Sequence, residues 1–301
     1  MDASCRVGLV GVGAMGGGVA RALLARGLPV VVRDLVRDRE AELEREGARG
    51  AASAALAAAQ ADVLVTLVVD AAQTRAVLFG PEGVLEARAV PPVVMMCSTI
   101  APRDAEDIAA RLAARGVAML DAPISGGPAR ARAGTLSMMV SGADEALARA
   151  RPAIDAMAAK VFRMGEHPGD GSRMKMVNNM LAAANLAAGC EAMAMAARLG
   201  LDLGEAARVV EASSGASWIF SDRIPRALRG DYAPRAAARV LLKDVGIFAD
   251  VARELGLTAP MAECAREVFR DTVARGHAEE DDAAVLRRYA EAWRLELPSA
   301  R

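Results

Sequence analysis

The chain has 301 residues, 53% of them apolar, and its 37 basic and 38 acidic residues leave a formal net charge of −1. This length allows two domains, and this apolar content excludes an intrinsically disordered chain. Charges of both signs are mixed along the sequence, so we expect no nucleic-acid partner and no anionic membrane surface.

The first half of the chain alternates between short apolar runs and helical segments rich in Ala, Arg and Glu. Six runs predict strands, at residues 6–10, 28–33, 62–69, 92–98, 117–121 and 135–141. Near-continuous apolar strands separated by helices are typical of a parallel sheet covered on both faces. Residues 1–166 therefore predict a doubly wound α/β domain.

From residue 167 to 301 the strand patterns disappear and helical segments follow one another. The turn-rich stretch GEHPGDGS (165–172) marks the boundary. A helix is predicted over about 172–199, roughly 40 Å long at 1.5 Å per residue, joining the α/β domain to an all-α domain. Its uncharged part, 176–190, is shorter than the ~18 residues that span a bilayer, so we expect a soluble protein without a membrane partner.

A glycine motif, GVGAMG (11–16), lies between the first predicted strand and the helix after it. Gly11 permits the tight turn, Gly13 lets the main chain approach a pyrophosphate, and Gly16 allows close helix–strand packing. A plain glycine-rich turn has the same pattern, but this position favours dinucleotide binding by a Rossmann domain. The predicted cofactor contacts are Gly11, Val12, Gly13, Ala14, Met15 and Gly16.

An acidic residue, Asp34, ends the second predicted strand, 18 residues after Gly16. A carboxylate at this place accepts hydrogen bonds from the adenosine ribose hydroxyls and repels a 2′-phosphate, which favours NAD over NADP. Arg33 and Arg37 flank Asp34 and keep NADP open.

Two polar stretches follow later strands of this domain. Ser125, Gly126 and Gly127 come after a strand that ends at Asp121, and Thr99 follows the preceding strand. Strand carboxyl ends in such sheets face the ligand crevice, where a hydroxyl and two main-chain N–H groups suit a carboxylate. The residues alone leave open a simple tight turn at 125–127.

The long predicted helix begins with polar side chains. Lys175 and Asn179 are four residues apart and share one helical face, with Asn178 beside them. A buried lysine without a carboxylate nearby in sequence is unfavourable, which suggests a site; a polar first turn that caps a buried helix is the alternative. Lys243, in LLKDVGIF (241–248), is either a further site residue or a lysine lying along apolar surface beside an exposed aspartate.

Cysteine and histidine usage excludes several kinds of site. The four cysteines lie in or beside apolar segments without a CxxC pair, which predicts buried free thiols and a cytoplasmic protein. His167 and His277 lie in turns flanked by Gly or Pro, so we expect surface histidines, no metal site and no Ser/His/Asp triad.

Four motifs, in order and spanning essentially the whole chain, resemble the β-hydroxyacid dehydrogenase family, the 3-hydroxyisobutyrate dehydrogenase-like enzymes. GVGAMG matches its cofactor motif, DAPISGG (121–127) its substrate motif, and GDGSRMKMVNN (169–179) its catalytic motif GxGxxxKxxNN; Lys243-Asp244 matches its C-terminal pair. SWIFSDRIP (217–225) and GHAEEDDAAV (276–285) are similar to the L-threonate dehydrogenase-like branch, which acts on four-carbon sugar acids. Many members of that branch have glutamine where Asn179 stands.

The resemblance implies an NAD(P)-dependent oxidoreductase that transfers a hydride between a short hydroxy acid and the nicotinamide. Lys175 would be the general base, its pKa lowered from about 10.4 by burial and a second cation such as Lys243. The other implied roles are carboxylate binding by Ser125, Gly126 and Gly127, orientation by Asn178 or Asn179, cofactor contacts by Val68 and Thr99, and closure over cofactor and substrate by Lys243. Many members have Leu-Pro where this chain has Val68-Val69.

The resemblance leaves the substrate open among L-threonate, 3-hydroxyisobutyrate and tartronate semialdehyde, and it implies a homodimer or homotetramer. A non-catalytic dinucleotide-binding module is the rival from another class, but an intact Lys175 with both asparagines argues against it. An imine reductase-like protein of the same architecture would normally lack this lysine.

Overall fold

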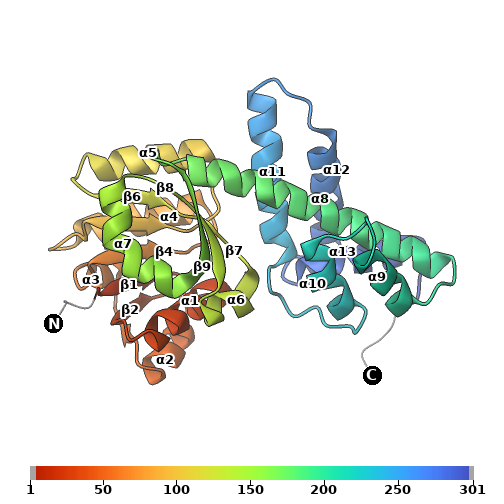
Figure 1. Ribbon diagram of the computed structural model, residues 1–301, viewed down its shortest axis with the longest axis horizontal. Helices are drawn as coiled ribbons and strands as arrows, with labels where there is room; N and C mark the ends of the chain where they lie inside the picture. Colours follow the sequence, from red (N-terminus) through yellow and green to blue (C-terminus); the bar gives the residue numbers. More distant parts are fainter. Residues whose placement is uncertain (1–4, 298–301) are drawn as a thin grey trace. The chain divides into compact units, whose positions relative to one another are not determined.

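The computed structural model describes residues 5–297 and divides the chain into a sheet unit, residues 1–175, and a helical unit, residues 176–301 (Figure 1). The sequence placed the boundary between residues 166 and 167, whereas the division falls between Lys175 and Met176. The reason is that helix α8 (Asp170–Arg198) bonds through its first turn to residues of the sheet unit.

Within the described part of the sheet unit, nine strands form one sheet in the order β3-β2-β1-β4-β5-β6-β8-β7, with β9 paired to β8. The strands are β1 (Val7–Val10), β2 (Val30–Arg33), β3 (Arg49–Gly50), β4 (Val63–Thr66), β5 (Val93–Met96), β6 (Ala118–Asp121), β7 (Ile124–Ser125), β8 (Leu136–Ser141) and β9 (Ala158–Gly165). From β3 to β6 all pairs are parallel, and Val7 lies opposite both Val30 and Val63. The chain order reverses at β1, so a ligand crevice is expected beyond its carboxyl end.

Two apolar cores cover the two faces of this sheet, because successive strand side chains point to opposite faces. Val7 and Leu9 pack on the side of α1 and α7, whereas Val10 and Leu64 pack on the side of α3, α4 and α5. The helices of this unit are α1 (Ala14–Ala25), α2 (Arg37–Arg45), α3 (Ala54–Ala58), α4 (Ala71–Phe79), the 3₁₀ turn η1 (Val84–Glu86), α5 (Pro102–Ala113), α6 (Gly127–Ala133) and α7 (Asp144–Met157). The predicted Rossmann domain, with its mostly parallel sheet, is confirmed.

The structure contains three strands that were not predicted, β3, β7 and β9, and the direction of β8 differs from the prediction. β3 and β7 have two residues each, too few for a sequence pattern, and most side chains of β9 are exposed, so β9 contains no apolar run. We expected β8 to extend the parallel sheet, but it runs antiparallel to β6 and β7. After β7 the chain reverses through the seven-residue α6, and β8 starts beside the end of β7, at the same end of the sheet, so it runs in the opposite direction.

The helical unit surrounds an apolar core, in which Phe220 and Phe269 are among the largest buried side chains. Its elements after α8 are α9 (Leu203–Glu211), α10 (Trp218–Ala227), α11 (Ala238–Glu254), α12 (Pro260–Thr272), the π-helical turn η2 (Val273–His277), the 3₁₀ turn η3 (Asp282–Ala284) and α13 (Val285–Trp293). Helices α11 and α12 lie side by side (Figure 1). The predicted all-helical second region is confirmed.

Helix α8 is one unbroken helix of 29 residues (Figure 1). By length and composition alone it could cross a membrane, although its uncharged run at 176–190 is too short to do so; 39% of its most apolar window is buried. Leu186, Cys190 and Met193 on this helix belong to the core of the helical unit. Its apolar composition is therefore explained in part by packing within the protein.

Two expectations about single residues are wrong. Cys97 and Cys190 are buried, and burial raises the pKa of both thiols, but Cys264 is exposed and Cys5 only half-buried. His277 is not a surface residue: it is buried, and its Nε2 lies 2.8 Å from a carboxylate oxygen of Glu291.

Candidate active site

The glycine motif forms the turn between β1 and α1. Gly11 has a φ of +93°, and a Cβ at Gly16 would overlap the carbonyl oxygen of Gly11. A Cβ at Gly13 would have only Arg39 within reach, at 3.8 Å, so the main chain here is open to a ligand. Helix α1 begins without a side-chain cap or an acidic residue in its first turn. Its N–H groups therefore suit a pyrophosphate, and the motif fits a dinucleotide.

Asp34 joins the glycine turn to the end of β2. Its Oδ2 accepts a hydrogen bond from the main-chain N–H of Val12 (2.7 Å), and its Oδ1 accepts one from Val36 (2.9 Å). Arg39 lies 3.5 Å from Oδ1. A carboxylate oxygen accepts two hydrogen bonds, so Oδ2 retains capacity for a ribose hydroxyl.

The two arginines that kept NADP open are both paired with carboxylates. Glu40, only 2% exposed, accepts from Arg33 at 3.1 Å and from Arg37 at 2.6 Å. It also accepts from the main-chain N–H of Asp34 (2.6 Å), and Arg37 reaches Glu44 as well. Both guanidinium groups are thus directed toward these acids. Glu40 could not be singled out from the sequence, because nothing in the sequence of its helix distinguishes it from the neighbouring glutamates.

Val68 and Thr99 lie at the carboxyl ends of β4 and β5. The main-chain N–H of Val68 donates to the hydroxyl of Ser98 (3.0 Å), which links the segments after the two strands. A Cβ at Gly11 would lie 2.9 Å from a methyl carbon of Val68, so Val68 borders the glycine turn. Thr99 is half-buried and follows Ser98 directly.

The segment Ser125–Gly127 leaves the sheet at the end of β7. Ser125 pairs with Ser137 of β8, and Gly126 and Gly127 have φ values of +137° and +75°. All three residues are half-buried. The positive φ values give the sharp change of direction expected of a tight turn between β7 and α6, and carboxylate binding by these residues stays a prediction.

Lys175 lies in the second turn of α8 and is 7% exposed. Its Nζ donates a hydrogen bond to the carbonyl oxygen of Ile124 (2.8 Å), the residue directly before Ser125. The sheet unit therefore brings the lysine of the catalytic motif to the substrate motif, although 51 residues separate them.

Asp121, indicated by the sequence only as a strand end and as the first residue of DAPISGG, bonds to the helix that carries Lys175. It is fully buried at the end of β6 and accepts hydrogen bonds from the first turn of α8. Burial raises the pKa of its carboxyl, while the donors of Ser172, Gly169 and Ser141 act in the opposite direction. The sequence feature that could have identified Asp121 is its position as the first residue of DAPISGG.

In the helical unit the two asparagines and Lys243 are linked through Asp244. The Nδ2 of Asn178 donates to Oδ1 of Asn179 (3.0 Å), and Nδ2 of Asn179 donates to Asp244 (2.6 Å). Lys243 Nζ donates to the other oxygen of Asp244 (2.6 Å). One of the two alternatives for Lys243 required an exposed aspartate beside it, but Asp244 is only 5% exposed. It aligns the asparagine pair, which follows Lys175 by one turn of α8.

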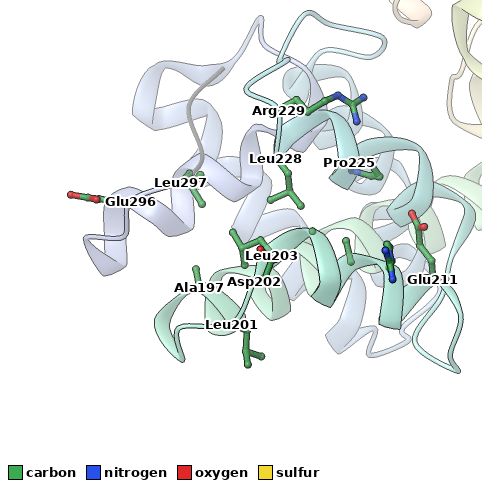
Figure 2. Close-up of a pocket in the computed structure, with 13 residues that line it drawn as sticks. Ala197, Leu201, Asp202, Leu203, Glu211, Pro225, Leu228, Arg229, Glu296 and Leu297 are labelled. Atoms are coloured by element: carbon green, nitrogen blue, oxygen red, sulfur yellow. The ribbon is translucent and has the colours of Figure 1, made fainter. Parts of the chain in front are cut away.

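A separate cavity of about 770 Å³ lies in the helical unit (Figure 2). Its lining comes from the end of α8, from α9 and α10, and from Glu296 and Leu297 near the C-terminus. None of the motif residues lines it, so its position does not support a role in the reaction.

Both halves of the chain match described families. Residues 6–165 match the NAD binding domain of 6-phosphogluconate dehydrogenase, and residues 169–289 match the NAD-binding family of NADP-dependent 3-hydroxyisobutyrate dehydrogenase. The L-threonate dehydrogenase of Escherichia coli (strain K12) is 41% identical over 296 residues, 98% of this chain and 97% of that protein. The 3-hydroxyisobutyrate dehydrogenase of Pseudomonas aeruginosa is 36% identical over 270 residues, 87% and 90% of the two chains.

Solved structures agree with these matches. A crystal structure of 3-hydroxyisobutyrate dehydrogenase from Salmonella typhimurium is 42% identical with a TM-score of 0.89, covering 94% of this chain and 99% of that one. Psf3, in complex with NADP+ and 2-OPP, is 30% identical with a TM-score of 0.86, covering 93% and 99%.

Proposed function

Given that this chain belongs to the 3-hydroxyisobutyrate dehydrogenase-like family of NAD(P)-dependent hydroxyacid dehydrogenases, we propose that it oxidises a four-carbon sugar acid of the L-threonate type, with Lys175 as general base. The chief support for the site is the hydrogen bond from Lys175 Nζ to the carbonyl of Ile124. It holds an amine one residue from Ser125, whose hydroxyl and following N–H groups suit the substrate carboxylate.

The residues of the site divide the chemistry between them. NAD(P), when bound, accepts the hydride from the carbon that carries the hydroxyl. The neutral amine of Lys175 takes the hydroxyl proton as the carbonyl forms, and the ammonium returns it in the reverse direction. Ser125 and the N–H groups of Gly126 and Gly127 hold the carboxylate.

Orientation and cofactor binding fall to the remaining motif residues. Asn178 or Asn179 orients the substrate and the lysine, and Lys243 closes over them. The main chain of residues 11–16 holds the pyrophosphate, Asp34 the adenosine ribose, and Val68 and Thr99 flank the cofactor. We propose NAD over NADP, because Glu40 engages both Arg33 and Arg37 beside Asp34.

The substrate proposal rests on the relatives. Identity is 41% over 98% of this chain to an L-threonate dehydrogenase and 36% over 87% of it to a 3-hydroxyisobutyrate dehydrogenase. The 42% identical solved structure is named a 3-hydroxyisobutyrate dehydrogenase, which makes 3-hydroxyisobutyrate the second candidate substrate.

An activity screen tests this proposal. L-Threonate, D-erythronate, 3-hydroxyisobutyrate and D-glycerate are each supplied with NAD or NADP, and the reduced cofactor is followed by absorbance. We expect the highest kcat/KM with L-threonate and NAD. A preference for 3-hydroxyisobutyrate selects the second candidate. If no substrate of the panel is oxidised although the protein binds NADH, a non-catalytic dinucleotide-binding module is favoured.

Two variants test the residue roles. Lys175→Ala should lower kcat by about 10²–10⁴ while NADH affinity stays near that of the unaltered protein. Turnover within a few-fold of the unaltered enzyme refutes the general-base role. Asp34→Ala should relax the preference for NAD, and tighter binding of NADPH than NADH before substitution contradicts the role of Asp34.

We also propose a cytoplasmic homo-oligomer, a dimer or tetramer. The four cysteines are free thiols, in keeping with a reducing compartment. The helical unit exposes several large apolar side chains, among them Leu199, Leu201, Leu255 and Leu257, which suit a contact between copies. Light scattering during gel filtration gives the mass; a monomer at micromolar concentration contradicts this proposal.

A further inference from the structure

The buried carboxylate of Asp121 binds the first turn of α8 from another element of the fold. Its Oδ2 accepts from the main-chain N–H groups of Gly169 (2.9 Å) and Ser172 (2.8 Å), and its Oδ1 accepts from the Ser172 hydroxyl (2.8 Å). The hydroxyl of Ser141, on β8, accepts from the N–H of Gly171 (3.0 Å) and lies 3.5 Å from Oδ2 of Asp121. The unpaired N–H groups that begin a helix are here satisfied by side chains of the sheet.

The same short segment contacts α8 at a second point. Three residues after Asp121, the carbonyl of Ile124 accepts from Lys175 Nζ, and Lys175 stands three residues after Ser172. Residues 121–124 and residues 172–175 are thus joined at both ends. Ser125 follows immediately on one side, so the spacing between Ser125 and Lys175 depends on this double connection.

The close approach of α8 to the sheet at this contact requires glycine at Gly171 of the catalytic motif. A Cβ at Gly171 would lie 2.6 Å from the carbonyl oxygens of both Asp121 and Met139. No side chain can be inserted there without moving the main chain of the sheet. The first turn of α8 therefore lies directly against the ends of β6 and β8.

We propose that Asp121 is a positioning residue for the reaction: by holding the first turn of α8 it sets the place of Lys175 Nζ relative to Ser125. The inference rests on the proposed role of Lys175 as general base. A residue just before the helix could satisfy the same N–H groups, as Asp202 does for α9. A carboxylate supplied by β6 instead ties the helix to the segment that carries Ser125, and a displacement of ~1 Å in such a site lowers turnover by about 10²-fold.

Two substitutions at Asp121 separate position from charge. Asp121→Ala removes the acceptors, and we expect kcat to fall about 10- to 100-fold. Asp121→Asn keeps the shape: its carbonyl oxygen can take the two N–H bonds, and its amide can donate to the Ser172 hydroxyl, which also accepts. We expect kcat of Asp121→Asn within about threefold of the unaltered enzyme, and KM for NAD unchanged in both.

A second measurement follows Lys175 without using activity. The chain has three lysines, Lys160, Lys175 and Lys243. Each is found in a separate peptide after limited amine modification with trinitrobenzenesulfonate and mass spectrometry. Asp121→Ala should change the labelling rate of Lys175 severalfold relative to Lys160, whereas Asp121→Asn should leave it near the unaltered value.

Asp202→Ala is the matched control, because Asp202 caps α9 by accepting from the N–H of Glu205 (2.7 Å) in the helical unit. It should lower the melting temperature without changing kcat or the labelling of Lys175. If Asp121→Ala does not fold, Ser172→Ala removes only the hydroxyl bond, and we expect smaller changes in the same direction for both readouts.

The possible results distinguish a failure of the Asp121 inference from a failure of the proposed function. The inference is overturned if folded Asp121→Ala keeps kcat within threefold or leaves Lys175 labelling unchanged, or if Asp121→Asn loses as much activity as Asp121→Ala. Full activity of Lys175→Ala would instead refute the proposed function, and the labelling of Lys175 in the Asp121 variants would still decide whether Asp121 positions that amine.

Discussion

Gly189 lies in the interior of α8, and the ring of Phe220 occupies the space beside it. A Cβ on Gly189 would lie 2.6 Å from Cδ2 and 3.3 Å from Cε2 of that ring. Carbon atoms in contact are normally about 3.5–4.0 Å apart, so a Gly189→Ala substitution requires the ring to move by about 1 Å. Phe220 is 2% exposed and packed in the core of the helical unit, so it has little room to move.

Two effects of Gly189→Ala oppose each other. Alanine in a helix interior is about 1 kcal/mol more favourable than glycine. Overpacking a close-packed core costs about 1–3 kcal/mol. Because the contact is far inside the normal distance, we expect overpacking to exceed the helix gain, and the helical unit to lose about 1 kcal/mol of unfolding free energy.

Gly246→Ala on α11 is the matched control. The nearest atom to a Cβ at Gly246 is the Arg266 Nε at 3.9 Å, so only the helix gain applies. We expect stabilisation by about 0.5–1 kcal/mol. The two glycines, both within helices of one unit, should therefore respond with opposite sign.

Urea denaturation followed by tryptophan fluorescence measures both effects, since Trp218 and Trp293 both belong to the helical unit. A second variant, Gly189→Ala with Phe220→Leu, should be more stable than the sum of its single changes, because the smaller side chain relieves the overlap. The reasoning is refuted if Gly189→Ala is as stable as the unaltered protein, or if the pair shows no coupling.

Three other predictions follow from the sheet unit. Gly16→Ala should abolish NADH binding, measured by fluorescence titration, because the new methyl overlaps the Gly11 carbonyl; an affinity within threefold of the unaltered value contradicts this. Glu40→Gln removes the charge that holds Arg33, so the NADP-to-NAD ratio of kcat/KM should rise severalfold, and an unchanged ratio rejects the role of Glu40. Burial raises the pKa of the Asp121 carboxyl, so the folded protein binds the carboxyl proton more tightly than the unfolded chain does. The free energy of unfolding that this protonation contributes is therefore lost as pH rises from about 4 through the pKa of the folded state. The stability of Asp121→Asn relative to the unaltered protein should therefore increase with pH in urea denaturation, whereas a constant difference would show that Asp121 has no raised pKa.

Much of the architecture was predictable because its signals are local. A strand buried on both faces must be apolar throughout, and β1, β4 and β5 were therefore visible as continuous runs. The glycine turn was readable for a similar reason, since the close approach at Gly16 admits no side chain. Short β3 and exposed β9 lacked any such constraint and were missed.

The sequence by itself determined the fold class and identified Lys175, Ser125 and the asparagines as members of motifs. Only the tertiary structure decided what connects them: Asp121 to Ser172 across 51 residues, and Asn179 to Asp244 across 65. A hydrogen bond between distant residues imposes no periodicity on either segment. Its partners become recognisable only once strand order and helix packing bring a buried carboxylate within reach of the donors that it must satisfy.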